Sequence, residues 1–270
     1  MTADPFNRPD SGFNSLPGWT WIGCYGGYYL QSDLLFAQGF EHGFFTRLWH
    51  GRGPDQLVGS ISAGATVHRP QQIHSGIVLE ASTAQGEPWP EADGLVSDQG
   101  GQSLWVCGAD CTPVLIADPG TGHAAACHAG WRGVAAGILP TAIDRLIERG
   151  AQRSELIIAL GPAVSGARYQ VGEDVVSAIC SNLDAHQSDS PPSRQSLERT
   201  GALLPDPEAD RYRIDIRAAA TLQLKLVGVS AEQIAHCPLC TVSEPTLFHS
   251  WRRDQVKAVQ WSGIVAQASS

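Results

Sequence analysis

The stretch LWVCGADCTPVLIAD (Leu104–Asp118) joins two apolar runs through a corner of small residues. A third apolar run, AAAC (124–127), follows after a short break and ends at the corner HAGWRG (128–133). Short apolar runs between turn-forming residues are typical of buried β-strands. We therefore predict that this region forms buried strands of a sheet, with polar side chains presented at the corners where the strands end.

Strand and helix patterns continue on both sides of this region. In the segment 134–149, Ile138, Ala142 and Leu146 recur four residues apart, as in an amphipathic helix. The other predicted elements are strands at 20–30, 72–80 and 156–162 and helices at 173–183 and 215–227. Strands that alternate with helices predict an α/β fold, here a layered α/β sandwich with mixed sheets.

Length and composition fit one domain. The chain has 270 residues, of which 43% are hydrophobic and 17% are charged, and this is enough to bury one large core. We expect a single domain over 1–270, with 1–19 flexible. The segment 184–210 has few apolar residues and several Pro, Ser and Asp residues, so we expect it to form an exposed loop.

Charge and cysteine content exclude several classes of protein. The formal net charge is -9, and a nucleic-acid backbone would be repelled by this field, so we expect no nucleic-acid partner. No run of about 18 apolar residues predicts a membrane span. The seven cysteines are an odd number in a long chain, which favours free thiols in the cytoplasm. No sequence feature predicts a protein partner.

Three polar residues stand beside small residues at the ends of apolar runs. They are His74 in QIHSG, Cys111 in ADCTP and His128 in HAGWRG. Imidazole and thiolate are good ligands for Zn(II), and three protein ligands leave a fourth position for water or substrate, as in catalytic sites. A single His or Cys in a strand is also common as a packing residue, so spacing alone leaves both interpretations open.

Longer motifs connect these residues. The chain contains ADG (92–94), ADCTPVLIADP (109–119), HAGWRG (128–133), LGPAVSGARYQVG (160–172), CT (240–241) and SWRRD (250–254) in this order. In these motifs the sequence resembles the YfiH or laccase-domain family, once called multicopper polyphenol oxidases and more recently purine nucleoside phosphorylases. The resemblance runs from about Gly43 to about Gly263.

The resemblance implies a metal triad of His74, Cys111 and His128, with Zn(II) as the expected ion and copper as an alternative. It implies phosphorolysis of adenosine, inosine, guanosine and methylthioadenosine, together with deamination of adenosine. The partners would therefore be a small purine nucleoside and phosphate. The implied fold is similar to the catalytic domain of cytotoxic necrotizing factor.

Four arginines are candidates for binding substrate or phosphate. Arg47 lies in HGFFTR (42–47), where a guanidinium fork can match phosphate oxygens or form a surface ion pair. Arg132 can bind phosphate or brace its turn through backbone carbonyls. Arg252 and Arg253 are predicted on a strand, where alternation allows only one of them to face the site. The loop after Arg47 differs from the family pattern, as does Trp251, which replaces a Tyr.

The role of Asp93 and the reaction itself each have alternatives. Asp93 is a candidate acid/base group for deamination, and it can equally cap the turn before Gly94. A different class of enzyme is a metal-free hydrolase or amidase acting in peptidoglycan editing, with Cys111 as nucleophile and His128 as its base. Further alternatives are a copper-dependent polyphenol oxidase of laccase type and a non-catalytic binding module.

Overall fold

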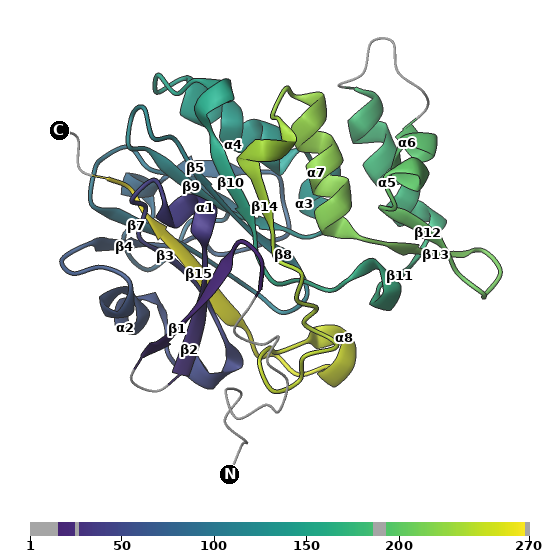
Figure 1. Cartoon of the computed structure of the whole chain (residues 1–270), viewed down its shortest axis with the longest axis horizontal. Coiled ribbons are helices and arrows are strands. Elements are labelled where there is room, and N and C mark those ends of the chain that lie inside the picture. The colour runs from purple at the N-terminus through teal and green to yellow at the C-terminus, as the bar shows by residue number, and fades with distance from the viewer. Residues whose placement is uncertain (1–15, 25–26, 186–192, 268–270) are drawn as a thin grey trace.

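The computed structural model describes residues 16–24, 27–185 and 193–267, which form two large sheets and a small one, with the longer helices on one side (Figure 1). The strands are β1 (Trp19–Cys24), β2 (Gly27–Ser32), β3 (His42–Phe45), β4 (Thr66–His68), β5 (Val78–Glu80), β6 (Gly94–Val96), β7 (Gln102–Gly108), β8 (Thr112–Ala117), β9 (Ala124–Ala129), β10 (Ile157–Leu160), β11 (Gln170–Gly172), β12 (Leu203–Pro205), β13 (Arg211–Ile214), β14 (Ile234–His236) and β15 (Gln260–Val265). The α-helices are α1 (Asp33–Phe36), α2 (Pro54–Leu57), α3 (Trp131–Ala135), α4 (Ile138–Ile147), α5 (Glu173–Asp184), α6 (Ser193–Arg199), α7 (Ile216–Leu226) and α8 (Trp251–Asp254), and short 3-10 turns lie between several elements.

Both large sheets mix parallel and antiparallel neighbours. The first has six strands in the order β1-β2-β3-β15-β7-β4, and the second has six in the order β14-β10-β8-β9-β6-β5. Strand β4 runs parallel to β7 in the first sheet, whereas β5 runs parallel to β6 in the second. A smaller sheet, β11-β13-β12, lies beside them. The predicted α/β class with mixed sheets in one domain is confirmed.

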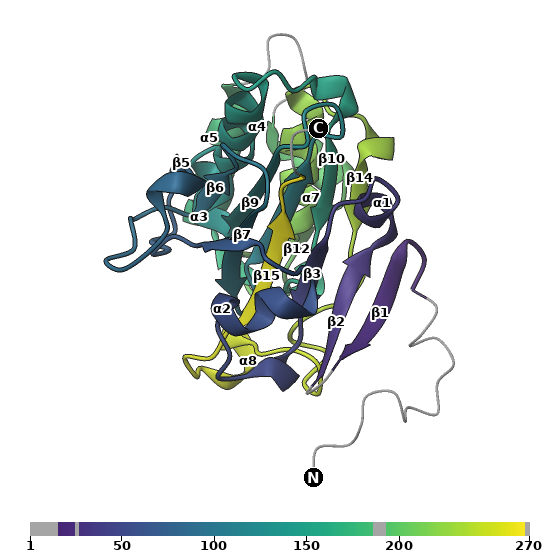
Figure 2. The ribbon, with the colours of Figure 1, turned by 90° about the vertical axis from the view of Figure 1, so that its left-hand side faces the viewer.

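Strand β8 shows how the second sheet lies between two layers. Val114 and Ile116 point toward the helices and pack in the same apolar cluster as the buried faces of α4, α5 and α7. Leu115 and Ala117 point the other way, into the cluster shared with the first sheet. Because successive strand residues face opposite sides, one strand buried on both faces reads as a continuous apolar run. Figure 2 shows the three layers from the side.

The helix predicted at 134–149 is divided in two. Gly137 has a φ of 76°, in the left-handed region, and separates α3 from α4. The apolar spacing is correct only for α4, where Ile138, Ala142 and Leu146 are buried. The strand predicted at 72–80 is likewise shorter, since only Val78–Glu80 pairs as β5. The segment before it is a loop, which becomes important at the functional site.

The exposed loop predicted at 184–210 contains regular structure. Residues 186–192 lie outside the described part of the chain, but helix α6 and strand β12 follow. Leu197 and Leu203 are buried, so the few apolar residues of this segment are placed where they pack. The prediction is wrong for 193–205. Of the predicted flexible segment 1–19, residues 1–15 are not described, while Trp19 begins β1 and is only 3% exposed.

None of the helices in the described ranges is long and apolar enough to cross a membrane.

Candidate metal centre

Adjacent strands place Cys111 and His128 side by side. Cys111 directly precedes β8, and His128 lies in β9, which pairs with β8 in antiparallel register. The register sets Thr112 opposite Ala129 and Pro113 opposite His128. The corner between β7 and β8 therefore delivers the Cys111 thiol to the end of β9.

Asp93 joins the site from the neighbouring strand. It precedes β6, which pairs with β9 so that Gly94 stands opposite Cys127. The His128 N–H donates to the Asp93 carbonyl over 2.7 Å, and His128 Nδ1 lies 2.9 Å from Asp93 Oδ1. A carboxylate that accepts from Nδ1 fixes the imidazole ring and leaves Nε2 available for a metal ion.

The same carboxylate organises the loop that carries His74. Asp93 Oδ1 accepts from the His74 N–H at 3.0 Å, while Oδ2 accepts from the Ile73 N–H at 3.2 Å. Oδ2 also accepts from the Ser75 N–H at 2.6 Å and from the Ser75 hydroxyl at 2.8 Å. His74 has a φ of 61°, which few residues other than Gly adopt without such support. Asp93 thus positions two of the three predicted ligands.

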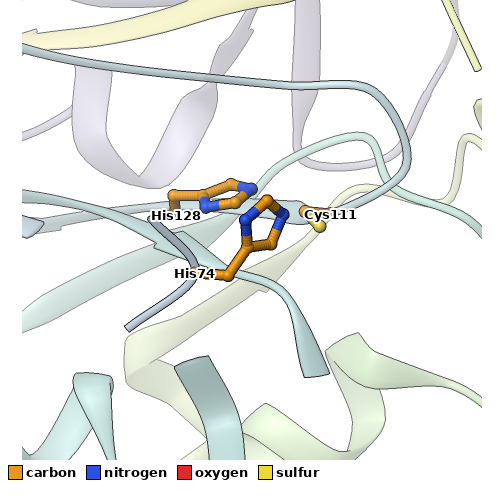
Figure 3. A group of neighbouring side chains, drawn as sticks. All are labelled: His74, Cys111 and His128. Carbon is orange, nitrogen blue, oxygen red and sulfur yellow. The ribbon is translucent and has the colours of Figure 1, made fainter. Parts of the chain in front are cut away.

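The triad converges on one point. The ligand atoms of His74, Cys111 and His128 lie within 4.8 Å of one another, and Figure 3 shows the three side chains together. The two imidazole rings cross at 77° with their centroids 4.9 Å apart. In a tetrahedral zinc site the ligand atoms stand about 3.5 Å apart, so a small movement of the exposed His74 ring is enough to close the set on an ion. The donors present fit a zinc ion.

Small residues leave the space that such an ion needs. A Cβ added to Gly130 would lie 2.7 Å from Cys111 Sγ and 3.8 Å from His74 Cδ2. A Cβ added to Gly108 would lie 3.7 Å from His128 Cδ2. The glycines of the two corners therefore keep the triad accessible.

The triad is also electrostatically coupled. Burial opposes ionisation of the Cys111 thiol, but hydrogen bonds from His128 and His74 lower its pKa to about 6. Burial likewise disfavours the charged His128 ring, but Asp93 and Cys111 raise the pKa of His128 to about 9. Between these values the metal-free site holds a thiolate beside an imidazolium. A thiolate is the form of cysteine that binds metal and attacks electrophiles.

This coupling predicts the reactivity of the metal-free protein. Because the thiolate of Cys111 forms as pH rises through about 6, its alkylation by iodoacetamide should be half-maximal near that pH. Burial raises the pKa of Cys107, which borders the same cavity, to about 12, so Cys107 is the internal control and should react little below pH 9. Peptide mapping by mass spectrometry measures both sites. A half-maximal pH near 9 for Cys111 would contradict the coupling.

Gln72 attaches the His74 loop to strand β7. Its side-chain Nε2 donates to the Cys107 carbonyl at 2.7 Å, and its Oε1 accepts from the Cys107 N–H at 2.8 Å. One amide side chain thus satisfies both backbone groups of a strand residue, as a paired strand would. One residue separates Gln72 from His74, so these bonds fix the point from which the loop turns toward the site.

Replacing Gln72 should therefore weaken metal binding. We expect Gln72→Ala to raise the dissociation constant for zinc by about 10-fold, the lower end of the range for groups that orient metal ligands. The matched control is Gln71→Ala, because Gln71 is exposed and its hydrogen bonds, to Pro90 and Ala92, are made by its backbone. Competition with a zinc chelator measures both affinities. Equal affinities of the two variants would show that the amide of Gln72 does not position His74.

The triad opens into a cavity of about 650 Å³. This lies within the range of about 300–1,000 Å³ that is common for small-molecule sites. Aromatic side chains of Trp131, Tyr169 and Trp251 line it, and Trp251 is 51% exposed at its edge. The cavity is large enough for a ligand of nucleoside size with the triad at its wall.

The structure brings two of the four candidate arginines to the cavity. Arg132 and Arg252 both line it. Arg47 does not, and its guanidinium donates to the Pro245 carbonyl at 2.6 Å. Arg253 also lies off the cavity, because its guanidinium donates to the carbonyls of Thr241, Val242 and Phe248 and pairs with Asp254. Arg47 and Arg253 thus brace the backbone, and the geometry does not favour them as phosphate ligands.

The strand predicted for Arg252 and Arg253 is wrong. Both belong to the short helix α8, whose first turn is capped by the Ser250 hydroxyl accepting from the Arg253 N–H. Asp110 holds this helix at the site: its carboxylate accepts from the Arg252 N–H at 2.7 Å and from Ser250 and Thr241 hydroxyls. Within α8, Arg252 therefore lines the cavity, whereas the Arg253 guanidinium binds backbone carbonyls outside it.

Asp93 does not line the cavity, although it was a candidate acid/base group. Its two oxygens accept hydrogen bonds from the 73–75 backbone, Ser75 and His128, and it is fully buried. Burial raises its pKa, but His128 and Ser75 outweigh this effect and lower the pKa of Asp93 to about 2. Because both oxygens already accept these hydrogen bonds, Asp93 is suited to positioning His128 rather than to exchanging a proton with a substrate.

Sequence reasoning missed Gln72, Tyr169 and Lys257, all of which line the cavity. Gln72 stands two residues before His74 in QIHSG, and Tyr169 lies in the motif 160–172, so both were inside quoted motifs. Lys257 follows SWRRD and carried no signal. Contacts across the chain, not local pattern, identify these residues.

The chain is similar to known proteins over most of its length. The family model described as multi-copper polyphenol oxidoreductase laccase matches residues 55–267. A purine nucleoside phosphorylase of a Synechocystis species is 39% identical over 258 residues, which cover 92% of this chain and 97% of the relative. A purine nucleoside phosphorylase of Streptomyces coelicolor is 34% identical over 68% of each chain.

Solved structures share the fold. A crystal structure from Neisseria meningitidis is similar with a TM-score of 0.68 at 27% identity, covering 93% of this chain and 100% of the other. The structure of YlmD from Geobacillus stearothermophilus has a TM-score of 0.75 at 23% identity, covering 92% and 98% of the two chains. The second likeness concerns the fold alone.

Proposed function

The chain belongs to the multi-copper polyphenol oxidoreductase laccase family, and from that premise we propose that it is a zinc-containing purine nucleoside phosphorylase that also deaminates adenosine. The relatives named purine nucleoside phosphorylase support the reaction class. The substrates proposed are adenosine, inosine, guanosine and methylthioadenosine, acted on in the cytoplasm.

One observation carries the proposal: the three metal-ligand side chains open into a cavity of nucleoside size that also presents Arg132 and Arg252. A nucleoside phosphorylase must hold an uncharged nucleoside and a phosphate anion side by side. Aromatic walls suit the first, and guanidinium groups suit the second.

The site favours zinc over a multicopper centre. Imidazole and thiolate are good ligands for Zn(II), and three protein ligands leave a fourth position open, as in catalytic zinc sites. A multicopper oxidase needs further histidine clusters to pass electrons between ions. Within the described ranges, His74, Cys111 and His128 are the one group of His, Cys, Asp and Glu arranged to hold a metal. When bound, zinc supplies a Lewis acid beside the substrate.

The residues of the protein would contribute by binding the phosphate and the nucleoside and by orienting them for reaction. In phosphorolysis a phosphate oxygen bonds to C1′ of the ribose, the C1′–N9 bond breaks, and its electron pair leaves with the purine, which gains a proton. The cavity would hold the phosphate and the nucleoside together, with the base against its aromatic walls. Such positioning of two reactants contributes several kcal/mol to catalysis.

A second candidate is a metal-free cysteine hydrolase or amidase. A specific observation favours it: Asp93 contacts His128, which in turn is hydrogen-bonded to Cys111, as in a nucleophile–base–orienter arrangement. The lowered pKa of Cys111 and the raised pKa of His128 suit that chemistry as well as metal binding.

Two assays separate these functions. Adenosine and inosine are incubated with and without phosphate: the proposal expects ribose 1-phosphate only with phosphate, and ammonia from adenosine in both. The same assays follow removal of zinc with a chelator. Full activity after chelation overturns the zinc proposal, and hydrolysis of an amide substrate that depends on Cys111, with no nucleoside cleaved, establishes the hydrolase instead.

A further inference from the structure

Cationic side chains outnumber carboxylates in the lining of the cavity, although the chain as a whole is negative. The formal net charge is -9, yet Arg132, Arg252 and Lys257 all line the cavity. The single carboxylate in its lining, Asp110, is already occupied by hydrogen bonds from Thr241, Ser250 and the Arg252 backbone. A positive cleft attracts small anions, whereas the negative net charge of the whole protein repels large polyanions.

Two of these cations are held in place by aromatic rings. The Arg132 guanidinium lies 4.3 Å from the centroid of the Trp131 ring, and the Arg252 guanidinium lies 4.9 Å from that of Tyr169. Stacking fixes the plane of a guanidinium and leaves its N–H edge free to meet an oxyanion. Within the described ranges, the Arg132 side chain makes no hydrogen bond or ion pair with the protein. The Arg252 guanidinium makes one hydrogen bond, to the Gln170 carbonyl at 3.1 Å.

Tyr169 links the two arginines to the triad. Arg252 stacks on its ring, and the charges of Arg132, Arg252 and Cys111 all act on its phenol group. The Tyr169 hydroxyl is protonated at neutral pH, as an ordinary phenol is, and so can donate a hydrogen bond. Two arginines and one tyrosine with a hydroxyl donor thus line the same cavity as Cys111.

We propose that Arg132, Arg252 and Tyr169 form the subsite that binds the phosphate co-substrate, next to the metal triad. This inference rests on the proposed function, because it assigns one part of that same cavity. A guanidinium fork matches the oxygens of a tetrahedral oxyanion through paired hydrogen bonds. The phosphate of a nucleotide has the same chemistry, and we assign the subsite to inorganic phosphate because the triad leaves the adjoining space for an uncharged nucleoside.

The test uses four variants of the full chain loaded with zinc. Arg132→Ala and Arg252→Ala remove one guanidinium each, and Arg252→Lys keeps the charge without the fork. The matched control is Arg168→Ala, since Arg168 is exposed, neighbours Tyr169 and does not line the cavity. We expect the KM for phosphate to rise about 10-fold or more in the first three variants, with the KM for inosine changed less than about threefold. The control should keep the wild-type values.

A binding measurement accompanies the kinetics. Saturating inorganic phosphate should raise the Tm of the wild type and of Arg168→Ala by a few degrees, and that of Arg132→Ala and Arg252→Ala by less. Adenosine monophosphate is tested in parallel.

Each outcome decides between the inference and the function. Phosphate-dependent cleavage with an unchanged phosphate KM in the arginine variants overturns the subsite and leaves the function standing. An arginine-dependent Tm shift with phosphate, without any phosphate-dependent cleavage, supports the subsite and overturns the function. An arginine-dependent shift with adenosine monophosphate alone overturns the assignment to inorganic phosphate. No shift with either ligand, together with no cleavage, overturns both.

Discussion

Cys111→Ser should bind less than about a tenth of an equivalent of zinc and should lose at least about 10³-fold in kcat/KM for phosphorolysis, because the only thiolate of the triad is removed. Serine has nearly the same size, so the corner between β7 and β8 is not disturbed. Its hydroxyl is a far weaker ligand at neutral pH, since it does not ionise there. Metal analysis of the purified variant and steady-state kinetics measure the two effects.

Cys107→Ser is the matched control for this experiment. Cys107 borders the same cavity, but its pKa is raised to about 12 by burial and its thiol is no part of the triad. It should keep its zinc and most of its activity. A Cys111→Ser protein that retains one equivalent of zinc would contradict the ligand role of Cys111, whereas loss of activity with zinc retained would favour the cysteine nucleophile.

The second large effect is expected for Asp93→Asn. The carboxylate is fully buried and accepts from three backbone N–H groups, the Ser75 hydroxyl and His128. An amide group must turn its NH₂ toward some of these donors, so one or more hydrogen bonds are lost. Removing one partner of a buried charged pair typically costs about 3–5 kcal/mol, and loss of a group that orients metal ligands costs about 10- to 100-fold in affinity or activity.

The pH dependence of stability reports on the same group. The pKa of Asp93 falls from its ordinary 3.8 to about 2 on folding, so its contribution is present above about pH 4 and is lost as pH falls through about 2. Denaturant unfolding of the metal-free protein between pH 5 and pH 2 should therefore show a decline that is weaker in Asp93→Asn. The control is Asp55→Asn, because Asp55 is an exposed aspartate of α2 and lies outside the triad and its hydrogen bonds.

If Asp93→Asn does not fold, Ser75→Ala tests the same set of hydrogen bonds to the Asp93 carboxylate with a smaller change. It removes the hydroxyl donor to Oδ2 and leaves the backbone bonds in place. A wild-type zinc affinity and wild-type kinetics for both Asp93→Asn and Ser75→Ala would show that the carboxylate does not position the triad.

The layered core was predictable from the sequence because burial on both faces leaves a local pattern. The continuous apolar runs that became β7 and β8 and the four-residue spacing in α4 are of this kind. The break at Gly137 and the helix at Arg252 were not, since each depends on a turn of backbone that a few residues form in their tertiary surroundings. The helix that contains Leu197 was not predictable for a related reason: a single buried residue in a polar segment produces no hydrophobic periodicity.

The grouping of His74, Cys111 and His128 was predictable only with the long motifs around these residues. His74 lies 37 and 54 positions before its partners (111 minus 74 and 128 minus 74), and its loop is positioned by hydrogen bonds to Asp93 rather than by a strand. The candidate phosphate ligands were harder to predict. Arg47 and Arg253 are arginines with suitable chemistry whose groups are used by backbone carbonyls, and only the folded chain distinguishes them from Arg132 and Arg252.

The central claim is that His74, Cys111 and His128 hold one zinc ion, and X-ray absorption at the zinc edge tests it most directly. Protein purified without added metal should contain about one zinc per chain, with one sulfur at about 2.3 Å and two histidine nitrogens at about 2.0–2.1 Å in its first shell. Zinc with no sulfur neighbour, or a protein fully active without zinc, would contradict the account.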